Sequence, residues 1–175
     1  LSATPRAIAG AIAPTAPDDT FVGRTVELRR LRSLLGEAAC RLLTITGPGG
    51  VGKTRLAQRA LAELAPSFAD GGRFVALEDV TTAAELGARL VHEFALKARD
   101  IDPVDAVAEH LRERQMLLVF DNFEQIADAA PLLERLLSGC PGLKLIVASR
   151  MRLALAAEWL LPLDGLPCPE EEDAD

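Results

Sequence analysis

The stretch GPGGVGKTRL, residues 47–56, places four glycines and a proline in six residues, directly before a lysine and a threonine. Glycine loses more conformational freedom on folding than any other residue, so this cluster indicates a backbone turn that side chains would obstruct. The phosphate-binding pattern G-x-x-x-x-G-K-[ST] begins at Gly47 and ends at Thr54. An apolar run, residues 41–46, precedes the loop and an amphipathic run follows it, which is the strand–loop–helix context that the pattern requires.

The residue types in this loop suit a polyphosphate ligand. Backbone N–H groups can turn inward around an anion, and the N-terminus of the following helix adds partial positive charge. Lys53 can reach the β- and γ-phosphates, and the Thr54 hydroxyl can ligate Mg²⁺. A glycine-rich turn without a ligand is the alternative interpretation, which the strand–helix context disfavours. The residues predicted to contact ATP or ADP here are Gly47, Gly49, Gly50, Val51, Gly52, Lys53, Thr54 and Arg55.

Three further charged residues follow apolar runs. Asp121 ends one such run, and a carboxylate at the carboxyl edge of a parallel sheet can hold the Mg²⁺ of a phosphate site, although an ordinary capping aspartate is the alternative. Glu124 can polarise a water near the γ-phosphate or cap the next helix. Arg150 can sense a γ-phosphate or be a surface arginine. The candidate catalytic residues are Lys53, Asp121, Glu124 and Arg150, and the candidate Mg²⁺ ligands are Thr54 and Asp121.

The remaining sequence alternates between strand-like and helix-like segments. The predicted strands are residues 41–46, 73–77, 116–120, 143–149 and 159–163. The predicted helices start from a cap at Thr25, near Arg55, from a capping box at Thr82 and Glu85, from Asp102–Pro103 and at Pro131. This alternation predicts an α/β fold with a parallel sheet and right-handed crossovers.

The composition indicates a globular chain. Of the 175 residues 49% are hydrophobic, enough for one good core. The formal net charge of −7 disfavours direct nucleic-acid binding, and the sequence lacks an apolar run long enough to predict a membrane span. It also lacks a signal-peptide pattern, and three widely spaced cysteines suggest free thiols. We therefore expect a cytoplasmic location.

The domain boundaries follow from shifts in composition. Residues 1–19 are rich in alanine and proline, which predicts a linker or tail. We predict a nucleotide-binding domain over residues 20–167 and an acidic tail over residues 168–175. Because the chain starts at a leucine, we expect it to be an excised part of a longer protein.

Four segments in this order resemble the STAND class of P-loop ATPases, of the NB-ARC kind. They are FVGRTVEL (21–28), TGPGGVGKTRLA (46–57), LLVFDNFEQ (117–125) and PGLKLIVASRMRLAL (141–155). The likeness is greatest to the nucleotide-binding domains of large bacterial transcriptional regulators of the SARP and LuxR types, and it covers nearly the whole domain. The phosphate-loop segment is specific by itself, whereas the other three gain weight only in combination.

The resemblance implies a three-layer α/β/α sandwich with a five-stranded, mainly parallel sheet in the order 5-1-4-3-2. Arg150 would then follow a strand that lies between the phosphate-loop strand and the Asp121 strand. Phe21, Val22 and Arg24 would line the adenine side. The family uses ATP/ADP exchange as a switch for homo-oligomerisation, hydrolyses ATP slowly, and continues into further C-terminal domains. Any DNA-binding domain would lie outside this chain.

Two other functions stay open from the sequence. A conventional P-loop NTPase or small-molecule kinase would turn over quickly, and a kinase would need a pocket for an acceptor substrate. A pure interaction module with a vestigial site is the second, which the intact Lys53, Thr54 and Asp121 disfavour.

Overall fold

The computed structural model describes residues 24–97 and 100–165. The predicted linker over residues 1–19, the predicted acidic tail over residues 168–175, and Phe21 and Val22 lie outside this part of the chain.

Strands and helices alternate along the described chain, as the sequence predicts. The strands are β1 (Leu42–Thr46), β2 (Gly72–Ala76), β3 (Met116–Asp121), β4 (Leu143–Ser149) and β5 (Glu158–Pro162). The helices are α1 (Thr25–Gly36), α2 (Lys53–Leu64), α3 (Ala83–Glu93), α4 (Pro103–Leu111) and α5 (Ala130–Gly139), with 3₁₀ segments η1 (Ala65–Ser67) and η2 (Phe123–Ala129). Each predicted strand agrees with the observed one to within a residue at either end.

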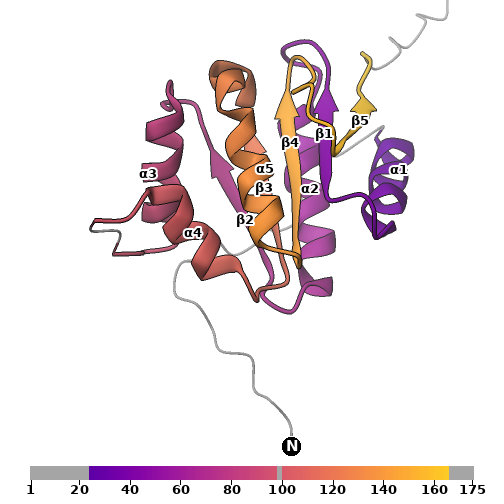
Figure 1. Ribbon diagram of the computed structural model, residues 1–175. Coiled ribbons are helices and arrows are strands. Elements are labelled where there is room, and N and C mark those ends of the chain that lie inside the picture. Colours follow the sequence, from indigo (N-terminus) through magenta and orange to yellow (C-terminus); the bar gives the residue numbers. More distant parts are fainter. Residues whose placement is uncertain (1–23, 98–99, 166–175) are drawn as a thin grey trace, which may run out of the picture.

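The five strands form one sheet in the order β2-β3-β4-β1-β5, in which every neighbouring pair is parallel (Figure 1). This is the strand order that the family resemblance implies, so that prediction is confirmed. Parallel neighbours require crossover connections. Here helices lie in the connections from β1 to β2, from β2 to β3 and from β3 to β4 and cover the sheet on both faces, whereas residues 150–157, which join β4 to β5, form no helix.

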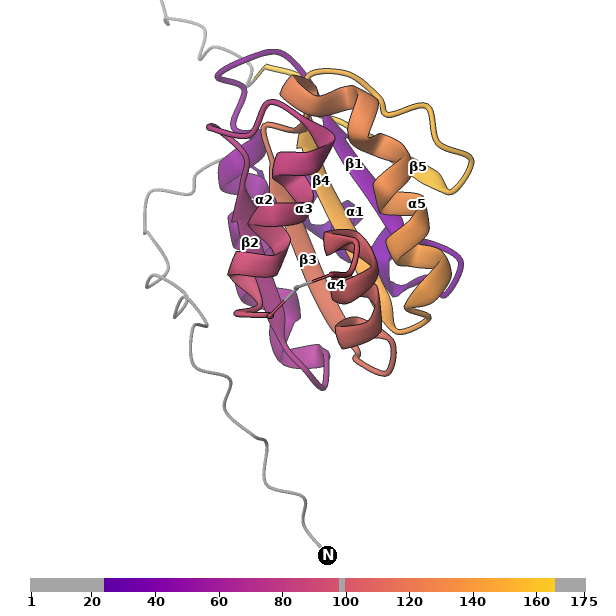
Figure 2. The same cartoon turned by 60° about the vertical axis from the view of Figure 1, so that its left-hand side comes forward.

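The core has two halves, one on each face of the sheet. Leu118 and Phe120 of β3 pack into the cluster that includes residues of α3, α4 and α5, whereas Leu117 and Val119 pack into the cluster that includes α1 and α2. Figure 2 shows α3 and α4 in front of the sheet. The four β3 side chains, at residues 117–120, are fully buried, as expected for a strand covered on both faces. The predicted three-layer α/β/α sandwich is confirmed.

The register brings three strand ends to one edge of the sheet. Thr46, the last residue of β1, pairs with Ser149, the last residue of β4. Phe120 of β3 pairs with Val147 of β4. The phosphate-loop pattern, Arg150 and Asp121 therefore meet at this edge, because each follows or ends one of these three strands.

Two helix starts follow the predicted capping, and one does not. The Thr82–Glu85 capping box is present at α3. At α1 the predicted cap at Thr25 is wrong: the N-cap residue is Arg24, Thr25 is the first helical residue, and the cap makes no side-chain hydrogen bond. The Arg24 side chain is used for tertiary contacts instead, which helix-capping patterns do not reveal.

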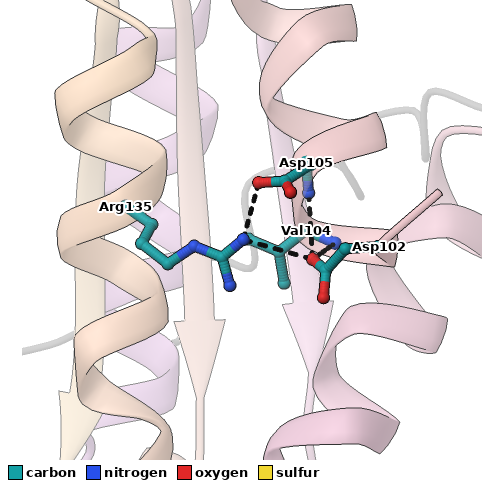
Figure 3. Close-up of polar contacts among 4 residues, drawn as sticks. All are labelled: Asp102, Val104, Asp105 and Arg135. Atoms are coloured by element: carbon teal, nitrogen blue, oxygen red, sulfur yellow. Dashed lines mark hydrogen bonds and ion pairs between the residues drawn. The ribbon is translucent and has the colours of Figure 1, made fainter.

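Asp102 caps α4 as predicted and also joins this helix to α5. Its carboxylate accepts hydrogen bonds from the backbone N–H groups of Asp105 (3.2 Å) and Val104 (2.9 Å), and the Asp105 bond is the main reason that its pKa lies below the ordinary value. Arg135 of α5 donates to Asp105 at 2.6 Å and to Asp102 at 3.3 Å (Figure 3). Since these side chains are about half exposed, the ion pairs add little to stability and mainly orient the two helices.

Gly47 lies where the loop after β1 passes very close to the segment after β5. The backbone N–H of Leu163 donates to the Thr46 carbonyl at 2.7 Å. A Cβ atom at position 47 would lie 2.4 Å from the Leu163 carbonyl oxygen, a contact that neither backbone can relieve without moving. Glycine at this position is therefore required by the fold.

We expect Gly47→Ala to destabilise the protein by about 1–3 kcal/mol, because the added methyl group overpacks a backbone contact. Gly49→Ala is the matched control, since a Cβ there would meet only the Arg150 side chain, at 3.4 Å. Urea denaturation of both variants measures the difference. Equal stability of the two variants would show that the Gly47–Leu163 contact is not a constraint on folding.

Candidate functional site

A pocket of about 250 Å³ lies at the sheet edge where β1, β3 and β4 end. Six of its lining residues come from the loop after β1 and the start of α2: Gly49, Gly50, Gly52, Lys53, Thr54 and Arg55. Asn122 and Glu124 from the segment after β3, and Arg150 from the end of β4, also line it. The structure thus brings most of the predicted site residues together in one pocket.

The loop uses glycine where the backbone requires it. Gly50 and Gly52 have φ angles of 76° and 97°, in the left-handed region that other residues rarely adopt. Gly52 is the N-cap residue of α2, so the left-handed turn delivers the chain directly into this helix. The first backbone N–H groups of a helix have no partner within it, and together with the helix dipole they attract anions. The N-terminal end of α2 therefore lines the pocket and can attract an anion there.

Lys53 is buried within the loop. Its side chain is only 9% exposed, and its Nζ donates to the carbonyl oxygens of Gly47 and Pro48, each at 2.8 Å. These two bonds hold the ammonium group on the inner side of the loop. A phosphate oxygen can replace a carbonyl as the acceptor, because an anion forms the stronger hydrogen bond to an ammonium group.

Thr54 and Asp121 bring two oxygen donors together from elements 67 residues apart. The Thr54 hydroxyl donates to Asp121 Oδ1 at 3.0 Å. Asp121 is 3% exposed, and this burial raises the pKa of its carboxyl group, against the lowering effect of the hydrogen bonds from Thr54 and from the Asn122 backbone. A buried carboxylate beside a hydroxyl is a donor set that suits Mg²⁺, which binds through oxygen ligands and often needs only one or two from the protein.

The fit to Mg²⁺ depends on phosphate and water for the remaining ligands. Among residues 24–97 and 100–165 no group of three or more His, Cys, Asp or Glu side chains could hold a metal ion by itself. The Thr54–Asp121 pair therefore fits a metal that is bound together with a phosphate ligand, and the described residues do not fit a cage made of protein side chains alone.

Glu124 and Arg150 form an ion pair in the pocket. Arg150 Nε lies 3.2 Å from Glu124 Oε1, and the side chains are 65% and 16% exposed, respectively. Sequence reasoning left open whether Glu124 caps the next helix; the residue at the N-cap of η2 is Asn122, in a left-handed conformation with φ of 59°. The ion pair itself was not predicted, because no sequence pattern relates two residues that follow different strands.

Arg24 does not line the pocket. It contacts the loop through the backbone carbonyl of Val51. It is 6% exposed and donates to the Val51 carbonyl at 3.0 Å, to the Asp164 carbonyl at 2.6 Å and to Glu27 Oε1 at 2.7 Å. Its hydrogen bond is the main cause of the lowered pKa of Glu27. Arg24 therefore ties α1 to the phosphate-binding loop and to the segment after β5. Its predicted role on the adenine side stays a prediction.

Arg55, Val51 and Asn122 differ in how they lie relative to the pocket. Arg55 is exposed at the pocket, whereas Val51 is half-buried and packs against the core on the α1–α2 face. Asn122 lines the pocket but was not among the predicted site residues. Its position directly after Asp121 is the signal that could have identified it.

Comparisons with known proteins identify the family of the chain. The AAA_22 family model, described as an AAA domain, matches residues 32–149. An uncharacterized protein of Mycobacterium tuberculosis is 33% identical over 147 residues, which cover 82% of this chain and 37% of that protein. A protein of the same organism named as an HTH-type transcriptional regulator is 35% identical over 136 residues, covering 75% of this chain and 15% of the regulator.

A longer match links the chain to a regulator from another genus. The regulatory protein AfsR of Streptomyces griseus is 32% identical over 170 residues, which cover 90% of this chain and 17% of AfsR. The chain thus spans between 15% and 37% of the length of these relatives. The predicted resemblance to the nucleotide-binding domains of bacterial transcriptional regulators is confirmed by these matches.

Solved structures share the fold. Cdc6p from Pyrobaculum aerophilum superposes with a TM-score of 0.66 at 18% identity, over 86% of this chain and 48% of that one. A STAND protein with a tetratricopeptide-repeat sensor from Pyrococcus horikoshii gives a TM-score of 0.51 at 23% identity, over 83% of this chain and 23% of that one. The phosphate-loop geometry and the family match lead to one assignment: the chain belongs to the AAA domain family of P-loop NTPases.

Proposed function

We propose that this chain is an ATP/ADP-binding, Mg²⁺-dependent switch module of a bacterial signalling protein, in which the nucleotide state controls assembly and signal output. The observation that carries the proposal is one pocket lined by three loop glycines, Lys53, Thr54 and Arg150, beside which the Thr54 hydroxyl donates to the buried Asp121. The regulators among the relatives support the wider role, because a regulator named as HTH-type and AfsR contain a segment like this chain.

Each residue has a definite task in this proposal. The backbone N–H groups of the loop and of the first turn of α2 bind the phosphates, and Lys53 transfers its hydrogen bonds from the loop carbonyls to phosphate oxygens. Thr54 and Asp121 hold the metal, which supplies positive charge against the phosphates. Arg150 reaches the terminal phosphate from the end of β4. Phe21, Val22 and Arg24 are proposed to line the adenine side.

The same residues favour slow hydrolysis. The residue after Asp121 is Asn122, whose amide can orient a water molecule but cannot accept its proton. Glu124 has a carboxylate, but its Oε1 is held in an ion pair with Arg150 and not directed at a water molecule alone. Nucleotide binding with slow hydrolysis suits a switch, because each nucleotide state then lasts long enough for other parts of the protein to respond to it.

The wider context of the module is also part of the proposal. We propose that it acts in the cytoplasm within a longer protein, with nucleotide-dependent homo-oligomerisation and with DNA binding carried by other domains. The net charge of −7 supports the absence of direct nucleic-acid binding by this chain. In the described part of the chain, no helix has the length and apolar character that a membrane span needs.

We expect Lys53→Ala to weaken the binding of both ATP and ADP by about 10- to 150-fold, because it removes a charge-assisted contact worth about 1.5–3 kcal/mol. Lys144→Ala is the matched control, since Lys144 also donates to two backbone carbonyls, those of Leu35 and Glu37, but does not line the pocket. Isothermal titration calorimetry measures both affinities. A Lys53→Ala variant that binds as tightly as the control would refute the assignment of this loop.

We expect Asp121→Asn to abolish the effect of Mg²⁺ on ATP binding without lowering the stability of the protein. The substitution removes a charge whose burial is unfavourable while keeping an acceptor for Thr54, so the nucleotide-free protein should melt higher, by about 2–4 °C for roughly 1 kcal/mol. The enhancement of ATP binding by Mg²⁺ should disappear. Thermal melting and calorimetry with and without Mg²⁺ test this, with the exposed Asp128→Asn as control. A large drop in Tm with an unchanged Mg²⁺ response would make Asp121 a structural residue.

We expect ATP turnover well below about 1 per second, the low end of typical enzymes, because no unpaired carboxylate among the described pocket residues is placed to take a proton from water. A steady-state phosphate-release assay measures it. Turnover of tens per second that Glu124→Gln abolishes would identify a working NTPase with Glu124 as its base, and stimulation by a phosphate acceptor would identify a kinase.

A further inference from the structure

Two of the three cationic side chains that line this pocket, Lys53 and Arg150, are bound to acceptors of the protein itself, and the third, Arg55, is exposed. Lys53 donates to the carbonyls of Gly47 and Pro48, and Arg150 pairs with Glu124. Lys53 loses two neutral acceptors when a phosphate arrives. Arg150 differs, because its partner carries a full negative charge that competes with a phosphate for the same guanidinium.

The two side chains of the Glu124–Arg150 pair differ in how far they are exposed and therefore in how easily each can move. Glu124 is 16% exposed, and its second oxygen, Oε2, is buried without a hydrogen-bond partner among the described residues. A buried acceptor without a donor is unfavourable, so the carboxylate is held in a place that does not satisfy it fully. Arg150 is 65% exposed and is therefore the member that can move at low cost. Its Nη2 lies 3.4 Å from the position that a Cβ on Gly49 would occupy, so the guanidinium already lies over the loop.

We infer that Glu124 sets the preference of the site between nucleoside triphosphate and diphosphate by competing with the terminal phosphate for Arg150. The inference rests on the proposed nucleotide site. A triphosphate places its last phosphate within reach of the guanidinium, and Arg150 leaves Glu124 to bind it. A diphosphate lacks this group, so the ion pair stays closed. The pair therefore lowers the affinity for triphosphate and leaves that for diphosphate nearly unchanged.

The exchange also changes the state of Glu124. While the pair is closed, the guanidinium neutralises the carboxylate. When Arg150 moves to the phosphate, Glu124 becomes an unpaired, largely buried carboxylate in the pocket, and its environment differs between the triphosphate and diphosphate states. The pair thus gives the η2 segment a way to respond to the terminal phosphate, because Glu124 lies in the first turn of η2.

A double-mutant cycle tests the competition. The measured quantity is the ratio of the ADP and ATP dissociation constants, determined by calorimetry with Mg²⁺ for the wild type, Glu124→Gln, Arg150→Gln and the double variant. We expect Glu124→Gln to raise the preference for ATP about two- to fivefold, in line with an ion pair that is partly exposed. We expect the same substitution to leave the ratio unchanged when Arg150 is already glutamine.

The cycle separates competition from simple repulsion. If Glu124→Gln raises the ratio equally with and without Arg150, Glu124 acts directly on the phosphate and the inference is wrong. If Glu124→Gln leaves the ratio unchanged in the presence of Arg150, the inference is also wrong. Glu109→Gln is the charge-matched control, because Glu109 pairs with Arg112 at 2.5 Å and does not line this pocket. The melting temperature of each variant shows whether it is folded.

The outcome distinguishes this inference from the function on which it rests. If the wild type binds neither nucleotide, the proposed function fails and the inference fails with it. If the wild type binds both, Lys53→Ala weakens both, and the cycle shows no coupling between Glu124 and Arg150, then only the inference fails. Arg150→Lys is a second variant, because it keeps the positive charge but removes the Nε that meets Glu124. It should retain more preference for ATP than Arg150→Gln.

Discussion

The position of β4 between β1 and β3 is the constraint on which the candidate site depends. In a parallel sheet the carboxyl ends of neighbouring strands meet at one edge, and β4 is the strand that separates the phosphate-binding loop from Asp121. Without that strand Arg150 would have no place between them. In the observed sheet the Thr54 hydroxyl, in the first turn of α2, donates to Asp121 Oδ1 at 3.0 Å, and the Arg150 guanidinium lies over Gly49.

Four charged side chains at the site have protein partners before any ligand binds, and a fifth, Arg55, is exposed at the pocket. Lys53 donates to two loop carbonyls, Asp121 accepts from the Thr54 hydroxyl, and Glu124 pairs with Arg150. A phosphate ligand must therefore replace some of these contacts. The carboxylate of Asp121 beside the Thr54 hydroxyl is a physical reason for expecting a nucleotide bound together with Mg²⁺ rather than a phosphate alone.

The sequence predicted the parts of this site that depend on local pattern. The loop, the five strands and the capping box of α3 follow from residue types and spacing. The strand order needed the family resemblance, since alternation alone allows several orders. The predicted cap of α1 was wrong for a tertiary reason. Arg24 is the N-cap residue in place of Thr25, and its guanidinium bridges the loop and the segment after β5. The Glu124–Arg150 pair was likewise unpredicted, since both residues become neighbours only through the sheet.

The most direct test of the central claim is a crystal structure of this chain with Mg²⁺ and a non-hydrolysable ATP analogue. We expect Lys53 Nζ to leave the carbonyls of Gly47 and Pro48 for phosphate oxygens, and Thr54 and Asp121 to hold the metal together with the phosphates. We also expect the Arg150 guanidinium to bind the terminal phosphate and to have left Glu124. A nucleotide bound elsewhere, or phosphates in this loop with Lys53 still on the two carbonyls, would contradict it.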